Sequence, residues 1–127
     1  MIQAQTILKI VDNSGGKKAR CIKIKGKRSA SARLGDIILV SVQSLRPRYK
    51  SQVKTKVQKS EIHHAVVVQT KSGYALKDGR LFYFGSNSIV LITPKHKLLG
   101  TRVSTYLPRV LRNLGWSRLG ILAKGLI

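Results

Sequence analysis

The feature that most restricts the fold of this 127-residue chain is a series of short apolar runs separated by turn residues. Each run is about four to seven residues long and rich in Ile, Val and aromatic residues, which is typical of β-strands. The runs cover residues 7–11, 21–24, 37–42, 62–68, 81–84 and 89–92. Because no segment with helical periodicity separates them, residues 1–93 are predicted to be all β.

Two of these runs are joined by a reverse-turn sequence. Asp78-Gly79 lies between the run that starts at Ile62 and the run at 81–84. Glycine readily adopts the positive φ that a tight turn needs, so this dipeptide predicts a β-hairpin.

The stretch 20–25 indicates how a strand is oriented in the sheet. Ile22 and Ile24 alternate with Cys21, Lys23 and Lys25, which predicts a dry face carrying the isoleucines and a wet face carrying the other three. Five or six antiparallel strands of this kind favour a small closed β-barrel over residues 1–93, because closure removes exposed sheet edges.

The residues after Pro94 have a different pattern and are predicted to form an extension, residues 94–127, on the same compact domain. Four apolar side chains follow the i, i+3, i+4, i+7 spacing of one helical face: Leu107, Val110, Leu111 and Leu114. Pro108 suits a first helical turn and Gly115 a helix end, so a short amphipathic helix is expected here. Trp116 and residues 119–123 form an apolar tail that must pack on the barrel or on another chain.

The charge balance predicts a polyanionic partner. The chain has 25 Lys and Arg but 4 Asp and Glu, a net charge of +21, while 43% of its residues are hydrophobic. The hydrophobic content is sufficient for a folded core, and at most four cations can pair with acids within the chain. Nucleic acid is the commonest partner for such an excess, and an anionic membrane surface is the next.

Other features exclude several classes of protein. A single cysteine, Cys21, cannot close an internal disulfide, and no apolar run reaches the length of a transmembrane helix. The first residues show neither a signal-peptide nor a transit-peptide pattern, so we expect synthesis in the compartment of function or prior removal of a targeting segment.

The residues that could support catalysis are scattered. Asp12, Asp36, Glu61 and Asp78 have no dyad spacing, and three of them adjoin Gly or Asn, where a carboxylate usually caps its own turn. The adjacent histidines 63 and 64 should face opposite sides of a strand, so they cannot share a metal ion. Cys21 is either a low-pKa thiol among lysines or, more commonly, a small core residue. No enzyme activity, metal or cofactor is therefore predicted.

Two basic segments without acids are the candidate nucleic-acid interface. Each cation that neutralises a phosphate releases counterions, which gives strong and salt-dependent affinity. In the first segment the cations are Lys17, Lys18, Arg20, Lys23, Lys25, Lys27, Arg28 and Arg33, and in the second the candidates are Arg46, Arg48, Lys50, Lys54 and Lys56. Tyr49 lies in the second segment and could stack on an unpaired base. Without a base-reading motif, recognition should depend on the shape and backbone of the nucleic acid.

Two other interpretations of the charge stay open. A free protein that compacts DNA would carry a similar excess of cations. A cationic membrane-active protein is disfavoured because the predicted helix is short and the cations lie mainly on strands and turns.

Several motifs resemble those of one family, the universal large-subunit ribosomal protein fourteen. The longest match is the spaced pattern Ala65-Val66-Val67-Val68, Asp78-Gly79, Phe84, Asn87 and Val90-Leu91. Shorter matches are Asp12-Asn13-Ser14-Gly15, Cys21-Ile22-Lys23, Gly35-Asp36-Ile37-Ile38, Pro47-Arg48 and Gly100-Thr101-Arg102, and they extend the resemblance over nearly the whole chain.

The resemblance implies a five-stranded barrel with a C-terminal loop and short helical extension. It implies binding to large-subunit rRNA, a bridge to small-subunit rRNA, and contacts with the large-subunit proteins nineteen and three. It also implies docking of a ribosome-silencing factor on Thr101 and Arg102, with Arg118 at the position of a family lysine and Arg109 and Arg112 on the same intersubunit surface.

The chain departs from the bacterial pattern at several points. Its loop at 48–61 is longer, and residues 109–112 read Arg-Val-Leu-Arg, without the acid of the family's extension. Such departures favour an organellar version, in the mitochondrial matrix as part of the mitochondrial ribosome, with plastid or bacterial cytoplasm as the alternatives.

Overall fold

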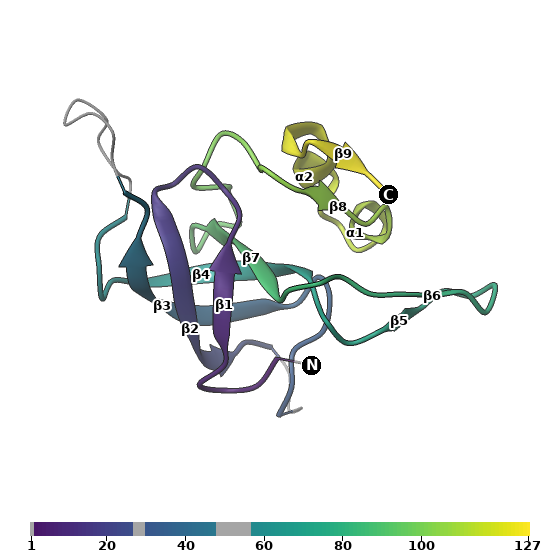
Figure 1. Cartoon of the computed structure of the whole chain (residues 1–127), viewed down its shortest axis with the longest axis horizontal. Helices are drawn as coiled ribbons and strands as arrows, with labels where there is room; N and C mark the ends of the chain where they lie inside the picture. The colour runs from purple at the N-terminus through teal and green to yellow at the C-terminus, as the bar shows by residue number, and fades with distance from the viewer. Residues whose placement is uncertain (1, 27–29, 48–56) are drawn as a thin grey trace.

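The computed structural model describes residues 2–26, 30–47 and 57–127. Five strands form a closed barrel in the order β1 (Ile7–Ile10), β2 (Gly16–Ile24), β3 (Ile37–Leu45), β4 (Ile62–Gln69) and β7 (Ser88–Ile92) (Figure 1). The predicted fold class, a small closed β-barrel with a short helical extension, is therefore confirmed.

The barrel closes through one parallel pair. Successive strands are antiparallel, whereas β1 and β7 run parallel, with Lys9 opposite Ser88 and Ile10 opposite Ile89. Five strands that alternate in direction return the last strand to the direction of the first. The parallel closing pair is thus a consequence of the odd strand number, which the prediction of an antiparallel barrel did not take into account.

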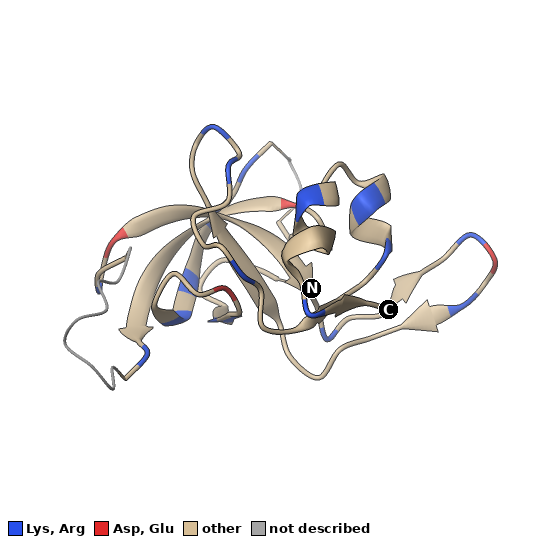
Figure 2. Ribbon diagram, turned by 90° about the horizontal axis from the view of Figure 1, so that it is seen from above, with Lys and Arg blue, Asp and Glu red and all other residues tan. Residues whose placement is uncertain are grey.

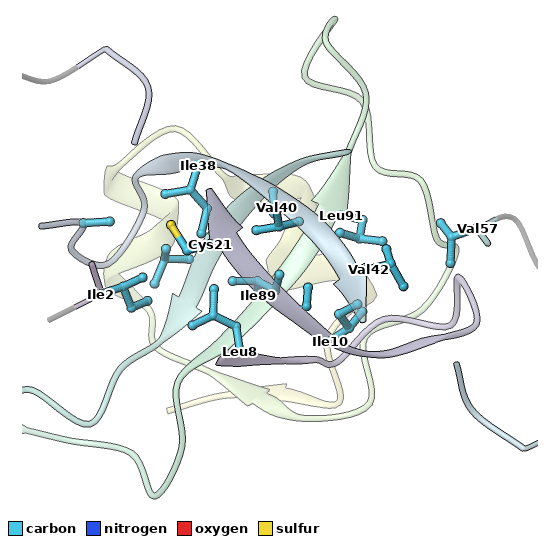
Figure 3. Close-up of a cluster of buried hydrophobic side chains, with 14 residues drawn as sticks. Ile2, Leu8, Ile10, Cys21, Ile38, Val40, Val42, Val57, Ile89 and Leu91 are labelled. Atoms are coloured by element: carbon cyan, nitrogen blue, oxygen red, sulfur yellow. The ribbon is translucent and has the colours of Figure 1, made fainter. Parts of the chain in front are cut away.

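The barrel interior is filled by aliphatic side chains from all five strands (Figure 3). Ile2 and Val57 lie toward opposite ends of this cluster in the view, and both are fully buried. Its buried members are Ile2, Leu8, Ile10, Ala19, Cys21, Ala32, Ile38, Val40, Val42, Val57, Ala65, Val67, Ile89 and Leu91. Burial of this apolar surface is the main force that closes the barrel.

The predicted orientation of β2 is wrong at its centre. Cys21 is fully buried in the barrel, whereas the side chain of Ile22 is 43% exposed on the outside. A register shift between Cys21 and Lys23 interrupts the alternation, so that Ile24, rather than Lys23, turns back toward the core. Cys21 is therefore a core residue, and its burial raises the pKa of the thiol, which disfavours the reactive thiolate.

The hairpin predicted at Asp78-Gly79 is confirmed, but it is not part of the barrel wall. Strands β5 (Tyr74–Ala75) and β6 (Leu81–Phe82) pair antiparallel and project away from the barrel (Figure 1). Gly79 has φ of +89° and donates its N–H to Leu76 O at 3.1 Å. The apolar run at 81–84 therefore belongs to this projecting hairpin.

The C-terminal extension contains two short helices and a strand pair. Strand β8 (Tyr106–Leu107) precedes helix α1 (Val110–Asn113), which is followed by α2 (Ser117–Leu122) and β9 (Gly125–Leu126), and β9 pairs with β8 in parallel. The predicted helix is confirmed but short: Leu107 belongs to β8, and Leu114 follows α1 and is 43% exposed. Gly115, with φ of +95°, lies at the turn after α1 as expected.

The apolar tail packs on the barrel. Leu119 of α2 and Leu111 of α1 are buried in a second cluster with Val66 and Val68 of β4 and Val90 of β7. Trp116 anchors the same region, since its indole Nε1 donates to Gly35 O at 3.1 Å. Strands β4 and β7 are consequently buried on both faces, which explains their uninterrupted apolar runs.

Candidate nucleic-acid interface

The four carboxylates of the chain close their own turns. Each of them accepts a backbone N–H from a residue two or three positions away, as Asx-type turns do. The bonds are Ser14 N to Asp12 Oδ1 (3.1 Å), Arg33 N to Asp36 Oδ2 (2.7 Å), Gln58 N to Glu61 Oε2 (3.1 Å) and Arg80 N to Asp78 Oδ1 (3.2 Å). The predicted turn-capping role of the acids is confirmed, and the acids are engaged in these turns instead of being spread among the β2 cations.

Asp12 has a further role in the barrel. Its side chain is buried, and its Oδ2 accepts the backbone N–H of Leu91 in β7 at 3.0 Å. Burial raises the pKa of Asp12, although the hydrogen bonds from Ser14 and Leu91 and the charge of Arg46 oppose that shift. Asp12 therefore holds the end of β1 against β7.

The outer face of β2 carries a row of exposed cations. Lys17, Lys18, Arg20 and Lys23 are all exposed, and Lys9 of β1 is exposed directly opposite Lys18. Register shifts on both sides of Lys18 allow two successive lysines to point outward while Gly16 and Ala19 remain buried. We call Lys9, Lys17, Lys18, Arg20 and Lys23 the cationic strand face.

Lys9 was missed from the sequence because it lies outside the two basic segments. The signal was present in the alternation Leu8-Lys9-Ile10, in which the flanking residues are buried and Lys9 is exposed. Only the pairing of β1 with β2 brings it beside Lys18.

Three other candidate cations have different surroundings. The Lys25 Nζ lies 2.6 Å from His64 Nε2, and Arg46 is half-buried and donates from Nη2 to Ile10 O at 2.9 Å. Partial burial, together with the positive charge of Lys25, lowers the pKa of His64 and favours the neutral ring that Lys25 contacts. Arg33 is exposed at the turn before β3. Arg46 thus has a structural role in addition to any contact with phosphate.

The remaining predicted residues of the interface lie outside the described part of the chain: Lys27, Arg28, Arg48, Tyr49, Lys50, Lys54 and Lys56.

The residues predicted for the intersubunit surface are all exposed but are divided over the extension. Thr101 and Arg102 lie together in the loop that contacts Asn13. Arg109 and Arg112 line a hollow of about 730 Å³ between α1 and the β5–β6 hairpin. Arg118 lines a separate hollow of about 520 Å³ beside Trp116. Figure 2 shows cations on both helices and at the hairpin tip.

The described residues contain no cluster of three or more His, Cys, Asp or Glu side chains that could hold a metal ion. His63 contacts Glu61 and His64 contacts Lys25, so the two rings have separate partners. Across the same ranges, none of the helices has the length and apolar character needed to cross a membrane.

Comparison with known families gives a match over the full length of the chain. The model of the family described as ribosomal protein L14p/L23e matches residues 1–127. The match includes the barrel, the projecting hairpin and the C-terminal extension, and it confirms the resemblance inferred from the sequence motifs.

Proposed function

Because the chain belongs to the ribosomal protein L14p/L23e family, whose members are structural proteins of the large ribosomal subunit and not enzymes, we propose that it binds large-subunit rRNA through its cationic strand face. This family membership places the chain in a ribosome.

The observation that carries the proposal is the asymmetry of the barrel surface. The outer face of β2 presents Lys17, Lys18, Arg20 and Lys23 to solvent, while the acids are engaged in turns. Several cations on one exposed strand face can neutralise phosphates along an RNA backbone without reading bases. Arg33, Lys25 and the candidates at 27–28 and 46–56 extend the proposed interface along the chain.

The extension supports the second part of the proposal. We infer that Thr101, Arg102, Arg109, Arg112 and Arg118 form the intersubunit side, where a bridge to small-subunit rRNA and the ribosome-silencing factor make contact. All five residues are exposed, and so is Ile121 of α2, at 81%. Exposed apolar side chains of this kind suit protein neighbours, which we propose to be the large-subunit proteins nineteen and three.

The departures from the bacterial pattern support a place in the mitochondrial ribosome, in the matrix. Plastid and bacterial cytoplasm are the alternative compartments. Fractionation of cells expressing a tagged chain decides among them, and recovery of the tag outside mitochondria contradicts the proposed compartment.

The test of rRNA binding is incorporation of variants into large subunits. The triple variant Lys18→Glu, Arg20→Glu, Lys23→Glu should sediment away from large subunits in a sucrose gradient, because reversed charges repel phosphate. A matched control changes three exposed cations elsewhere, Lys95→Glu, Lys97→Glu and Lys124→Glu, with the same change in net charge.

Normal incorporation of the β2 variant would contradict the proposed interface. The same gradient addresses the alternative function, a free protein that compacts nucleic acid. That alternative predicts that the unmodified chain sediments apart from ribosomes and binds duplex DNA as well as rRNA.

A further inference from the structure

The loop that carries Thr101 and Arg102 is held by a side chain 88 residues earlier in the chain. Asn13 follows β1 and accepts at Oδ1 the backbone N–H groups of Thr101 (2.7 Å) and Arg102 (3.1 Å). Its Nδ2 donates to Thr101 Oγ1 at 2.7 Å. One amide group thus satisfies two backbone donors and one hydroxyl of the loop.

The network fixes which way the Asn13 amide points. Two backbone N–H groups converge on one end of the amide, so that end must be the oxygen, and the NH₂ end must face Thr101 Oγ1. Since Nδ2 is a donor, the Thr101 oxygen is the acceptor in this bond. The hydroxyl hydrogen of Thr101 is therefore available to a group outside the loop.

Further contacts make the loop rigid. Asn13 N donates to Arg102 O at 3.2 Å, and Ser104 N donates to Val11 O at 2.9 Å. A Cβ added to Gly100 would lie 2.6 Å from Asn13 Oδ1, so the close approach depends on glycine. Asp12, next to Asn13, is buried and bonded to β7, which ties the loop to the closed barrel.

The two exposed side chains of this loop both offer hydrogen-bond donors. Thr101 offers its O–H and Arg102 its guanidinium, and both residues are exposed. We propose that Asn13 is a positioning residue that presents the Thr101 hydroxyl and the Arg102 guanidinium as a preorganised pair of donors, and that the protein docked there supplies acceptors, including a carboxylate opposite Arg102. This inference rests on the proposed docking of the ribosome-silencing factor at these two residues.

A protein partner fits the site better than RNA because of the element beside it. Val103 N donates to Leu122 O at 3.1 Å, so the loop runs along the end of α2. Ile121, adjacent to Leu122, is 81% exposed. An exposed aliphatic side chain on the helix that borders this loop suits an apolar and acidic protein surface, whereas phosphates would leave it without a partner.

The first experiment measures the positioning directly. Amide hydrogen exchange of Thr101 and Arg102 in the full-length Asn13→Ala variant should become ~10-fold faster or more, because the acceptor of both N–H groups is removed. Asn87→Ala is the matched control: Asn87 Oδ1 accepts Lys71 N at 2.8 Å in another loop, so its loss should not affect residues 101–102. Unchanged exchange in Asn13→Ala overturns the positioning role.

The second experiment measures docking of purified silencing factor on large subunits that contain each variant. Thr101→Val and Asn13→Ala should each weaken binding by roughly 3- to 10-fold, which corresponds to the loss of one hydrogen bond. Thr101→Ser keeps the hydroxyl and should restore binding. Arg102→Glu should abolish binding by opposing a carboxylate. The Asn87→Ala control should bind normally.

The variant Asn13→Asp separates the acceptor role of the Asn13 side chain from its donor role. Its carboxylate keeps an acceptor for both backbone N–H groups but replaces the Nδ2 donor with a second acceptor, which captures the Thr101 hydroxyl hydrogen. Exchange at 101–102 should therefore remain slow while docking weakens, and adding Asn13→Asp to Thr101→Val should have little further effect. Normal docking of Asn13→Asp overturns the inference about the hydroxyl.

The outcomes distinguish the inference from the function on which it rests. If Arg102→Glu leaves factor binding intact, the proposed docking surface and the acceptor groups assigned to its partner are both wrong, while the exchange data still decide whether Asn13 positions the loop. If Arg102→Glu abolishes docking but Thr101→Val and Asn13→Asp do not affect it, only the inference is wrong. If large subunits with Arg102→Glu no longer join small subunits but bind the factor normally, the site contacts RNA, and the proposal of a protein partner is overturned.

Discussion

The outer face of β4 and β7 and the outer face of β2 belong to the same barrel but have opposite surroundings. Val66, Val68 and Val90 lie under the C-terminal extension, whereas Lys18 and Arg20 lie in solvent. The inward side chains fill the interior of the barrel. Its two outer faces are therefore available for different purposes, one for the chain's own extension and the other for an external polyanion.

The covered face of β4 and β7 also determines where the loop that carries Thr101 and Arg102 lies. Packing of Leu111 and Leu119 on β4 and β7 places the extension over one side of the barrel, and the loop at 100–102 connects β7 to that extension. The proposed docking site is consequently built from both parts of the molecule, with Asn13 from the barrel and Thr101 from the extension.

The comparison is tested most strongly by shortening an aliphatic side chain on each face. Leu119→Ala, under the extension, should lower the free energy of unfolding by about 2–5 kcal/mol, because it leaves a cavity in a fully buried cluster. Ile22→Ala, on the exposed face of β2, should cost about 1 kcal/mol or less. Urea unfolding of both variants measures the difference, and equal losses would contradict the two-face description.

The next largest effect concerns RNA affinity. Changing Lys17, Lys18, Arg20 and Lys23 to Gln should weaken binding to rRNA on the order of 100-fold near ~0.1 M salt and make the dependence of log K on log salt shallower by about 3 units. Filter binding at several salt concentrations measures both quantities. In the same assay the control Leu119→Ala, where it remains folded, should keep the dependence of log K on log salt seen in the unmodified protein. If the four Gln substitutions leave this slope unchanged, the four residues do not contact phosphate.

A moderate effect is expected at the junction of the two regions. Asp12→Asn replaces one acceptor of the buried carboxylate with a donor that faces an N–H group, so it should cost about 1–3 kcal/mol of unfolding free energy. Ser104→Ala, at a half-buried bond to Val11 O, is the milder control.

The pH dependence of the same variant has a defined sign. The folded-state pKa of Asp12 is raised above its ordinary value of 3.8, so the folded protein binds this proton more readily than the unfolded chain. The contribution of Asp12 to stability is therefore fully present below 3.8 and is lost as pH rises through the raised pKa. The stability advantage of the unmodified protein over Asp12→Asn should be larger near about pH 4 than near about pH 7, and the reverse trend would contradict the raised pKa.

The smallest effect is local to the contact between β2 and β4. Lys25→Met removes a positive charge next to His64, so the pKa of His64 should rise toward its ordinary value of 6.5, although partial burial, the larger cause of the shift, remains. NMR titration of the imidazole protons measures the change. Lys18→Met, on the cationic strand face, should leave the titration of His64 unchanged.

Much of the architecture could be predicted from local patterns. Each of the six apolar runs lies in or overlaps a strand, and the hairpin at Asp78-Gly79 and the helix before Gly115 are present because their turn chemistry is local. The start of β2 could not be predicted, since Lys17 to Ala19 have the composition of a basic loop and become a strand only by pairing with β1 and β3. The inward position of Cys21 depends on register shifts that no local pattern reveals.

The candidate site was predicted in part. Lys17, Lys18, Arg20 and Lys23 were identified from a charge run without acids and lie on one exposed strand face. Lys9 and Asn13 were not identified, because their importance comes from neighbours that are distant in sequence, Lys18 for one and Thr101 for the other.

The sequence by itself determined that this chain forms a small β-domain with a large excess of positive charge, because strand length, turn residues and acid count are local or additive properties. It also determined the family, through motifs with specific spacing. Only the tertiary structure decided which face of the barrel is covered, which cations share a surface, and that Asn13 holds the loop of Thr101 and Arg102. The physical reason is that burial, strand register and hydrogen-bond geometry depend on contacts between residues far apart in the chain, and only folding brings these residues together.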